Sequence, residues 1–360
     1  MRVALVASLV SPLRAAEANG PHAVIVDLAR GLGARGHQVT VYAAEGSVAD
    51  GINLCQIPVD PVAAAASLRM GAATVSGTGT TVATDALDRA FGRLFDRLRH
   101  DRPDVVSQHA YDAAAIDLAE DLPVLHTLHL APIDDAVVRA ARSTRAPLAT
   151  VSHTARFAWR NAGVPELAVL RNGVPDRGPV DGALVPVALI AGRISPEKGT
   201  DIAIRVARRA GLAPLVVGDA YDTEYFARQV QPLLRPREWI GPVPRAELSA
   251  LMARCAVLLM PVRWDEAFGL VAAEAQMAGC PVVAFRRGAL PEVVEHGSGG
   301  WLVAPDDEPA LALAIAAARG LDRPSIRRRA QRKLGIERMV DAYERALTDV
   351  SAASAVARAS

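Results

Sequence analysis

Residues 257–284 read VLLMPVRWDEAFGLVAAEAQMAGCPVVA, and this stretch decides the fold. It begins with an apolar run at 257–260 and ends with another at 281–284, each of the length of a buried strand. Between them, a polar loop leads into a helix that we expect to begin at residues 268–270. Short apolar strands joined through a helix are typical of a parallel sheet with helices on its faces. The stretch therefore predicts a β-α-β unit of an α/β protein.

The same alternation continues on both sides of this unit and divides the chain into two halves. We expect two Rossmann-like, doubly wound parallel sheets, in domains at residues 1–175 and 183–335. A segment rich in proline and glycine, residues 173–182, is the predicted hinge between them. The expected strands are residues 3–7, 38–43, 104–106, 124–128 and 148–151 in the first half, and 185–191, 214–217, 239–240, 257–260 and 281–284 in the second.

The composition is that of an ordinary globular protein, and it excludes several structural classes and partners. The 360 residues are 51% hydrophobic and 22% charged, which excludes disorder and coiled coil. The 40 basic and 39 acidic residues leave a net charge of +1, so nucleic acid is not an expected partner. Three separated cysteines without a C-x-x-C pair favour the reducing cytoplasm. We expect neither a signal peptide nor an integral membrane segment, because the N-terminal apolar run is too short.

The glycines of Gly31-Leu-Gly33-Ala-Arg-Gly36 match the dinucleotide-binding pattern G-x-G-x-x-G but not its setting. In that pattern the glycines lie between a strand and the helix that follows it, where backbone amides meet a pyrophosphate. Here they close a predicted helix and precede a strand. We therefore interpret them as a helix C-terminus followed by a tight turn.

Two glutamates, Glu266 and Glu274, frame the predicted helix of the opening stretch. Eight residues of helix place them up to about 12 Å apart, which suits the separation of the hexose and the ribose in a nucleotide sugar. Each carboxylate can accept two hydrogen bonds from a vicinal diol. The helix N-terminus at Phe268-Gly269-Leu270 can offer free amides to a phosphate or sugar oxygen. The alternative is a helix-capping acid followed by an exposed helix glutamate.

A second group of candidate ligands follows the strand expected at residues 185–191. Its sequence is Gly192-Arg-Ile-Ser-Pro-Glu-Lys-Gly199, so Arg193 and Lys198 lie in the loop outside the carboxyl end of that strand. Two cations at this place can neutralise a pyrophosphate, and arginine can bind it in a bidentate manner. The alternative is a pair of solvated loop charges. We favour the interpretation that they bind a pyrophosphate, because Lys198 is one of only two lysines in the chain.

Arg193, Lys198 and the pair Glu266-x7-Glu274 together resemble the donor site of the retaining family-4 glycosyltransferases of GT-B fold. The resemblance extends over residues 1–345, with further motifs of the family in the same order. One departure is the first loop, where the family often has Gly-Gly and this chain has a single glycine, Gly20, which still permits close backbone approach. The further motifs are G-H-x-V-T-V at 36–41, T-x-H at 127–129, V-S at 151–152, N-G-V at 172–174, V-G-D at 217–219 and G-x-x-P-E at 288–292.

The resemblance implies a role for each matching residue. Arg193 and Lys198 would bind the diphosphate and stabilise its departing charge. Glu266 would hold hydroxyls of the transferred sugar, and Glu274 would hold the ribose. His129, from the other domain, would contact the sugar near the reacting carbon. The backbone amides for the sugar or phosphate would come from Phe268, Gly269 and Leu270.

The implied reaction moves a glucose-type hexose from a UDP-sugar to a hydroxyl of a small-molecule, glycan or lipid acceptor, with retention of configuration. No metal or other cofactor is expected, because the sequence has no D-x-D motif of the kind that binds a metal-bridged donor. The acceptor loops at residues 8–20 and 71–84 do not identify the acceptor, and we interpret the second as a mobile loop. Two alternatives stay open: another GT-B enzyme, such as a phosphorylase or nucleotide-sugar epimerase, and a catalytically silent nucleotide-sugar-binding protein.

Two further predictions concern the ends of the domains. In GT-B proteins the last helix often crosses back, so we expect a helix at residues 336–350 to pack on the N-terminal domain, with residues 351–360 as a tail. His109 follows an expected strand; it either lines the cleft between the two domains or has a structural role.

Overall fold

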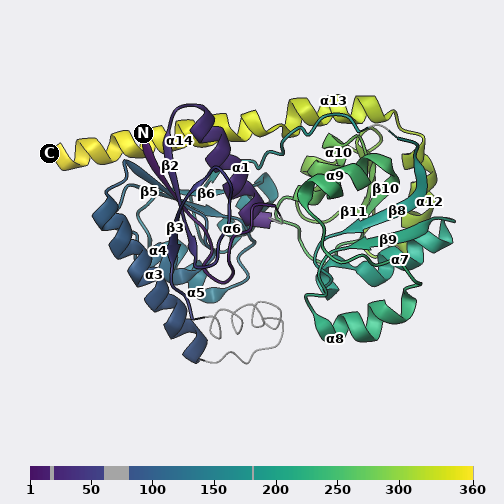
Figure 1. Cartoon of the computed structure of the whole chain (residues 1–360), viewed down its shortest axis with the longest axis horizontal. Coiled ribbons are helices and arrows are strands. Elements are labelled where there is room, and N and C mark those ends of the chain that lie inside the picture. The colour runs from purple at the N-terminus through teal and green to yellow at the C-terminus, as the bar shows by residue number, and fades with distance from the viewer. Residues whose placement is uncertain (17–19, 61–80, 181, 360) are drawn as a thin grey trace. The chain divides into compact units, whose positions relative to one another are not determined.

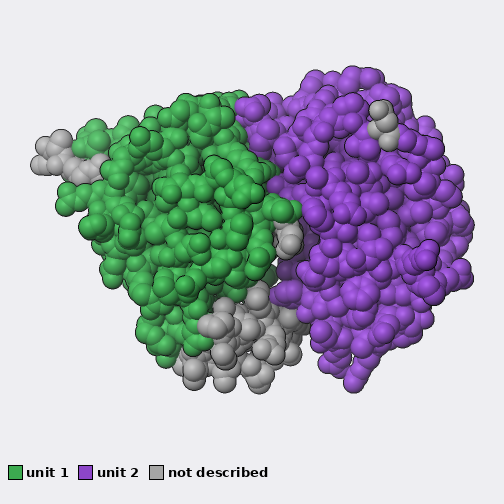
Figure 2. All heavy atoms as spheres, viewed as in Figure 1, with its two compact units in different colours: residues 1–171, 339–360 green, residues 172–338 purple. Residues whose placement is uncertain are grey.

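Two separate parallel sheets organise the chain, one in each half (Figure 1). The computed structural model describes residues 1–16, 20–60, 81–180 and 182–359. Unit 1 comprises residues 1–171 and 339–360, and unit 2 comprises residues 172–338 (Figure 2).

In unit 1, strand β1 (Arg2–Val6) runs through the middle of the sheet. Its side chains from Val3 onward are buried, as its uninterrupted apolar run predicts. It pairs in parallel with β2 on one side and β4 on the other. Among the described residues, the order across the sheet is β3-β2-β1-β4-β5-β6-β7. The other strands are β2 (Gln38–Ala44), β3 (Asn53–Ile57), β4 (Val105–Gln108), β5 (Val124–Leu128), β6 (Leu148–Thr150) and β7 (Ala168–Val169).

Helices pack on this sheet through buried apolar side chains. Phe91 and Phe95 of α3 share one core cluster with Val6 of β1 and Val106 of β4. Helix α1 buries Val24, Leu28 and Leu32, the residues that its apolar spacing predicts. Among the described residues, the helices between the strands of unit 1 are α1 (Gly20–Ala34), α3 (Thr81–Asp101), α4 (Ala113–Asp117), α5 (Asp135–Ser143) and α6 (His153–Asn161).

The C-terminal helix α14 (Ile336–Ala359) carries the chain from unit 2 into unit 1 (Figure 1). Its Tyr343 is fully buried and donates its hydroxyl to Thr127 Oγ1 at 3.3 Å. Arg35, just after α1, forms an ion pair with Asp341 of α14 at 2.6 Å. The expectation of a tail at residues 351–360 is wrong, because α14 continues to Ala359. That segment is rich in alanine and lacks glycine and proline, so nothing in it ends a helix.

In unit 2, β8 (Val185–Ala191) and β10 (Cys255–Met260) are neighbours at the centre of a second parallel sheet. Among the described residues its order is β12-β11-β10-β8-β9. Its core contains Ile190, Ile204 and Val257. The other strands are β9 (Ala213–Val217), β11 (Val282–Phe285) and β12 (Gly300–Val303), and the helices are α7 (Thr200–Arg209), α8 (Thr223–Tyr225), α9 (Arg245–Arg254), α10 (Leu270–Met277), α11 (Leu290–Val293), α12 (Glu308–Arg319) and α13 (Arg323–Leu334).

Most differences from the sequence prediction lie at sheet edges. The edge strands β3, β7 and β12 are not predicted from the sequence, because they are only two to five residues long and only partly buried. Residues 239–240 form no strand; Trp239 makes only an isolated bridge to Val216.

Two loop predictions have different outcomes. The first is the loop expected at residues 71–84. Its residues 71–80 lie outside the described residues, and the prediction is wrong for residues 81–84, where α3 begins. The predicted helix end is confirmed: Gly31 and Gly33 lie in the last turn of α1, which ends at Ala34, and Gly36 follows it with φ +86°.

Candidate active site

Three loops of unit 2 meet at the carboxyl edge of its sheet. They follow β8, β9 and β10, which are adjacent in the order β10-β8-β9. Gly218, just after β9, has φ +142°, and a Cβ there would lie 1.9 Å from the carbonyl oxygen of Gly192. Gly199 has φ +67°, and a Cβ there would lie 2.2 Å from the carbonyl oxygen of Pro261. Only glycine permits this close approach, which brings the side chains of the three loops together.

Lys198 and Glu266 form an ion pair across two of these loops. Lys198 ends the short 3-10 turn Pro196–Lys198 after β8, whereas Glu266 lies in the loop between β10 and α10. Lys198 Nζ lies 2.7 Å from Glu266 Oε2, and the two side chains are only 24% and 12% exposed. Trp264 Nε1 donates to the same oxygen at 3.0 Å. The pair therefore combines a half-buried cation with a carboxylate that is held from two sides.

Arg193 lies beside this pair in a setting of aromatic rings. Its guanidinium carbon is 5.0 Å from the ring centroid of Tyr221 and 5.6 Å from that of Trp264. Its Nε and Nη2 atoms lie 3.0 and 2.8 Å from Glu197 Oε1. Burial raises the pKa of Glu197, but the Ser195 hydrogen bond and the Arg193 charge outweigh it, and the pKa is lowered overall. Glu197 is thus an anionic partner that fixes Arg193 at the end of β8.

Helix α10 begins at the sequence position that the motif predicts. Gly269 is its N-cap with φ +92°, Leu270 is its first residue, and Phe268 is buried just before it. A Cβ on Gly288 would lie 2.3 Å from the backbone nitrogen and oxygen of Glu266, so the Gly288 turn packs directly on the loop that carries Glu266. This contact restrains the backbone of Glu266 and so helps to hold its side chain in the site.

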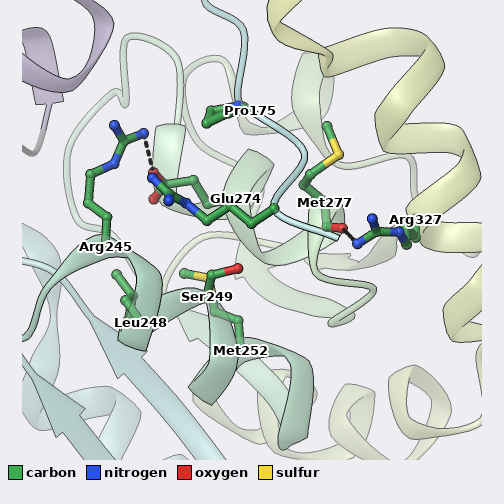
Figure 3. A pocket seen from close by; sticks show the side chains of 9 residues that line it. Pro175, Arg245, Leu248, Ser249, Met252, Glu274, Met277 and Arg327 are labelled. Carbon is green, nitrogen blue, oxygen red and sulfur yellow. Dashed lines mark hydrogen bonds and ion pairs between the residues drawn. The ribbon is translucent and has the colours of Figure 1, made fainter. Parts of the chain in front are cut away.

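Glu274 belongs to a different cluster of unit 2. It lies on α10, and its Oε1 is 3.2 Å from Nη2 of Arg245, the first residue of α9 (Figure 3). Arg245 is 8% and Glu274 19% exposed. The cavity beside them measures about 20 Å³, room for one water-sized molecule. It is lined by Pro175, Arg177, Arg245, Leu248, Ser249, Met252, Glu274, Met277 and Arg327.

Two residues of the predicted site belong to unit 1. Gly20 opens α1 with φ +50°, and no atom lies within 4 Å of the Cβ that a larger residue would add there. His129 follows β5 and is 6% exposed; its Nε2 lies 2.8 Å from Nδ1 of His109. Burial lowers the pKa of His129 to about 4. His109 is itself buried, and its Nε2 lies 2.9 Å from Ser107 Oγ, so it supports His129 from behind.

The structure therefore gathers Arg193, Lys198 and Glu266, places Glu274 further along α10, and assigns His129 and Gly20 to the other unit. Sequence reasoning missed the aromatic partners Tyr221 and Trp264. Trp264 lies two residues before Glu266 in the deciding stretch, so its position was a usable signal. Its contacts depend on a loop conformation that no periodicity encodes.

Two parallel α/β units, the second with cations and carboxylates at its strand ends, define the GT-B class of protein. A model described as Glycosyltransferase Family 4 matches residues 18–177, and one described as Glycosyl transferases group 1 matches residues 185–319. The chain belongs to the family-4 glycosyltransferases.

Individual relatives agree with this assignment. The chain is 28% identical over 270 residues to glycogen synthase of Mycobacterium tuberculosis; the match covers 64% of this chain and 63% of the relative, less than two thirds of its length. In structure it resembles sucrose-phosphate synthase from Thermosynechococcus elongatus, with a TM-score of 0.78, 18% identity and coverage of 98% and 99%. It also resembles Anabaena HepE in complex with UDP and glucose, with a TM-score of 0.73, 19% identity and coverage of 97% and 100%. These structural likenesses establish the GT-B fold.

The described residues contain neither a candidate membrane-spanning helix nor a candidate metal-binding cluster. None of the helices combines the length and the apolar character that crossing a bilayer requires. In the same part of the chain, no three His, Cys, Asp or Glu side chains gather as candidate metal ligands.

Proposed function

We propose that the protein is a glycosyltransferase that moves a glucose-type hexose from a UDP-sugar to a hydroxyl of a small-molecule, glycan or lipid acceptor, with retention of configuration. The observation that carries the proposal is the half-buried Lys198–Glu266 pair beside Arg193, at the carboxyl ends of β8 and β10. It offers cations for a diphosphate and a carboxylate for sugar hydroxyls at one place. The UDP and glucose bound to Anabaena HepE support the choice of donor.

In the proposed reaction, the cations take the charge that develops on the leaving group. The acceptor oxygen attacks the anomeric carbon, the bond from that carbon to the diphosphate oxygen breaks, and UDP leaves. The attack comes from the same face of the sugar that the diphosphate leaves, which preserves the configuration, and the acceptor proton passes to a phosphate oxygen of the leaving group. Arg193 and Lys198 stabilise the departing diphosphate. Because they supply the positive charge, we propose that the reaction needs no metal.

The other residues bind and orient the donor. Glu266 holds hydroxyls of the transferred hexose and Glu274 holds the ribose. His129 contacts the sugar as a neutral imidazole, in keeping with its pKa of about 4. Gly20 gives the first loop its close approach to the ligands. The α10 N-terminus offers backbone amides through Phe268, Gly269 and Leu270.

Compartment belongs to the same proposal. Cys55, Cys255 and Cys280 are free, and burial raises the pKa of the last two thiols, to about 11 and about 12. Cysteines that stay unpaired and protonated are typical of proteins in a reducing compartment, where disulfides do not form. We place the protein in the cytoplasm.

Donor screening followed by a turnover assay tests the proposal. UDP-glucose, related UDP-, GDP- and ADP-sugars and the free nucleotides are compared by thermal shift, because a ligand that binds the folded state raises the melting temperature. UDP release is then measured with and without a panel of hydroxyl acceptors. We expect release that depends on the acceptor. Release with phosphate alone would indicate a phosphorylase, rearrangement of the sugar an epimerase, and binding without turnover a silent protein.

The two glutamates should separate binding from turnover. Glu274→Gln should weaken UDP binding about tenfold, because Glu274 holds the ribose before and during the reaction. Glu266→Gln should leave UDP affinity within about twofold and lower kcat about tenfold, because the sugar that it orients becomes cationic in the transition state. Calorimetry with UDP and steady-state kinetics measure the two effects. Glu247→Gln, an exposed change on α9, is the matched control. Equal loss of UDP affinity in both variants would contradict this division of roles.

A further inference from the structure

Trp264 contacts three residues of the candidate site at once. Its Nε1 donates to Glu266 Oε2 at 3.0 Å, its ring centroid lies 4.7 Å from Lys198 Nζ, and the same centroid lies 5.6 Å from the guanidinium carbon of Arg193. The side chain is half-buried.

The hydrogen bonds of Glu266 are unevenly divided between its two oxygens. Oε2 accepts from Lys198 at 2.7 Å and from Trp264 at 3.0 Å. Oε1 has no hydrogen-bond partner in the part of the chain that the structure describes. A carboxylate oxygen can accept two hydrogen bonds. Oε1 is therefore the oxygen available to a ligand, while Oε2 anchors the side chain to the protein.

The two anchors of Oε2 respond differently to a diphosphate. Lys198 carries a full charge, so a bound diphosphate competes with Glu266 for its ammonium group. The indole N–H of Trp264 is neutral and has no acceptor among the described residues other than Glu266. When the ammonium group of Lys198 turns toward a phosphate, the hydrogen bond from Trp264 Nε1 to Glu266 Oε2 is retained.

We propose that Trp264 is a positioning residue that keeps Glu266 Oε1 directed at the hexose while Lys198 engages the diphosphate. The inference rests on the proposed function of Glu266 and Lys198 and adds a residue to it. The ring of Trp264 has a second effect, because a cation near an aromatic face is stabilised by the ring quadrupole. Through that contact it restrains Arg193 and Lys198, the cations that would receive the diphosphate.

Two substitutions separate the N–H group from the ring. Trp264→Phe removes the donor and keeps an aromatic face. It should lower kcat for the UDP-sugar about tenfold and leave the Kd for UDP within about twofold. Trp264→Leu removes both, so it should lower kcat at least as much and also raise the Kd for UDP about fivefold. Trp301→Phe is the matched control, since Trp301 lies in unit 2 and packs on His296, outside the site.

A measurement on the unmodified protein covers the case in which a variant does not fold. The chain has four tryptophans, and the indole resonance that moves in Glu266→Gln identifies Trp264 in a nitrogen-labelled sample. We expect this N–H to stay protected from exchange when UDP saturates the protein. Faster exchange would mean that the bond to Glu266 breaks, and the inference would be wrong.

The outcomes also distinguish this inference from the proposed function. If Trp264→Phe retains parental kcat while Glu266→Gln and Lys198→Ala lose activity, only the role of Trp264 fails. If all three keep parental activity, the site itself is wrongly placed. If Trp264→Phe weakens UDP binding as much as Trp264→Leu does, Trp264 acts through the cations and not through Glu266.

Discussion

Lys198→Ala should lower kcat/KM for the UDP-sugar by roughly 30- to 1,000-fold, equivalent to about 2–4 kcal/mol of transition-state stabilisation. The proposed leaving group is a diphosphate whose negative charge grows as the sugar bond breaks, and Lys198 is one of two cations at that place. Its side chain is only 24% exposed, and its ammonium group is already oriented by Glu266 and the Trp264 ring, so little reorganisation precedes its use. Steady-state kinetics with the best donor of the thermal-shift screen give the ratio.

The chain offers a matched control for this substitution, because its only other lysine is Lys333. Lys333 also forms an ion pair at 2.7 Å, with Glu295, but the two side chains are 64% and 47% exposed. Lys333→Ala should leave kcat/KM unchanged, since an exposed pair contributes only about 0–1 kcal/mol to stability. If Lys198→Ala keeps turnover within a few-fold of the parent protein, Lys198 is a loop charge and the proposed donor site is wrong.

The centre of each sheet could be predicted from the sequence, whereas the edges could not. Strands β1, β8 and β10 have a neighbouring strand on each side and contain consecutive buried residues, so each is marked by an apolar run in the sequence. The edge strands β3 and β7 have a partner on one side only and keep polar or exposed residues. They become strands because they pair with β2 and β6, and a pattern within their own residues does not indicate that pairing.

The grouping of Arg193, Lys198 and Glu266 follows from topology. β8 and β10 are adjacent parallel strands, so the loops after them emerge at the same edge. The sequence indicated two strands and two loops, and the resemblance to a family supplied their roles. The partners of these residues, Trp264 and Glu197, depend on how each loop folds over the strand ends, and that folding is set by tertiary contacts such as the approach of Gly199 to Pro261.

Below about pH 6.5, unit 1 should lose stability through its buried histidines. Burial lowers the pKa of His126 and His129 to about 4, and that of His109 well below its usual value, with the neighbouring His129 charge adding to the effect. Between pH 6.5 and 4 these histidines bind protons in the unfolded chain but not in the folded protein, so the free energy of unfolding falls as the pH falls. At pH 5 this amounts to about 2 kcal/mol for His126 and the same for His129. Burial raises the pKa of Asp112 to about 6, which opposes the loss by about 1 kcal/mol at pH 5.

His126 allows the effect to be tested on one side chain. Gln108 donates its amide to Ala110 O at 2.7 Å, so its Oε1 faces His126 and accepts from Nδ1 at 3.2 Å. The other ring nitrogen of His126 is buried without a hydrogen-bond partner among the described residues, and a proton there would create an unpaired buried charge. His126→Asn keeps a donor near Nδ1 and removes the site of protonation.

We therefore expect the parent protein to be at least about 3 kcal/mol less stable at pH 5 than at pH 7.5, because His109 adds to the loss from His126 and His129. His126→Asn should recover about 2 kcal/mol of that difference. Hydrogen exchange of the β4 and β5 amides reports the opening of unit 1 separately from that of unit 2. The exposed His100, at the end of α3, supplies the control His100→Asn, which should leave the difference unchanged. Equal protection of these amides at both pH values would show that the buried imidazoles take up protons in the folded state. His129 would then carry a positive charge near pH 6, and its proposed contact with the sugar as a neutral group would be wrong.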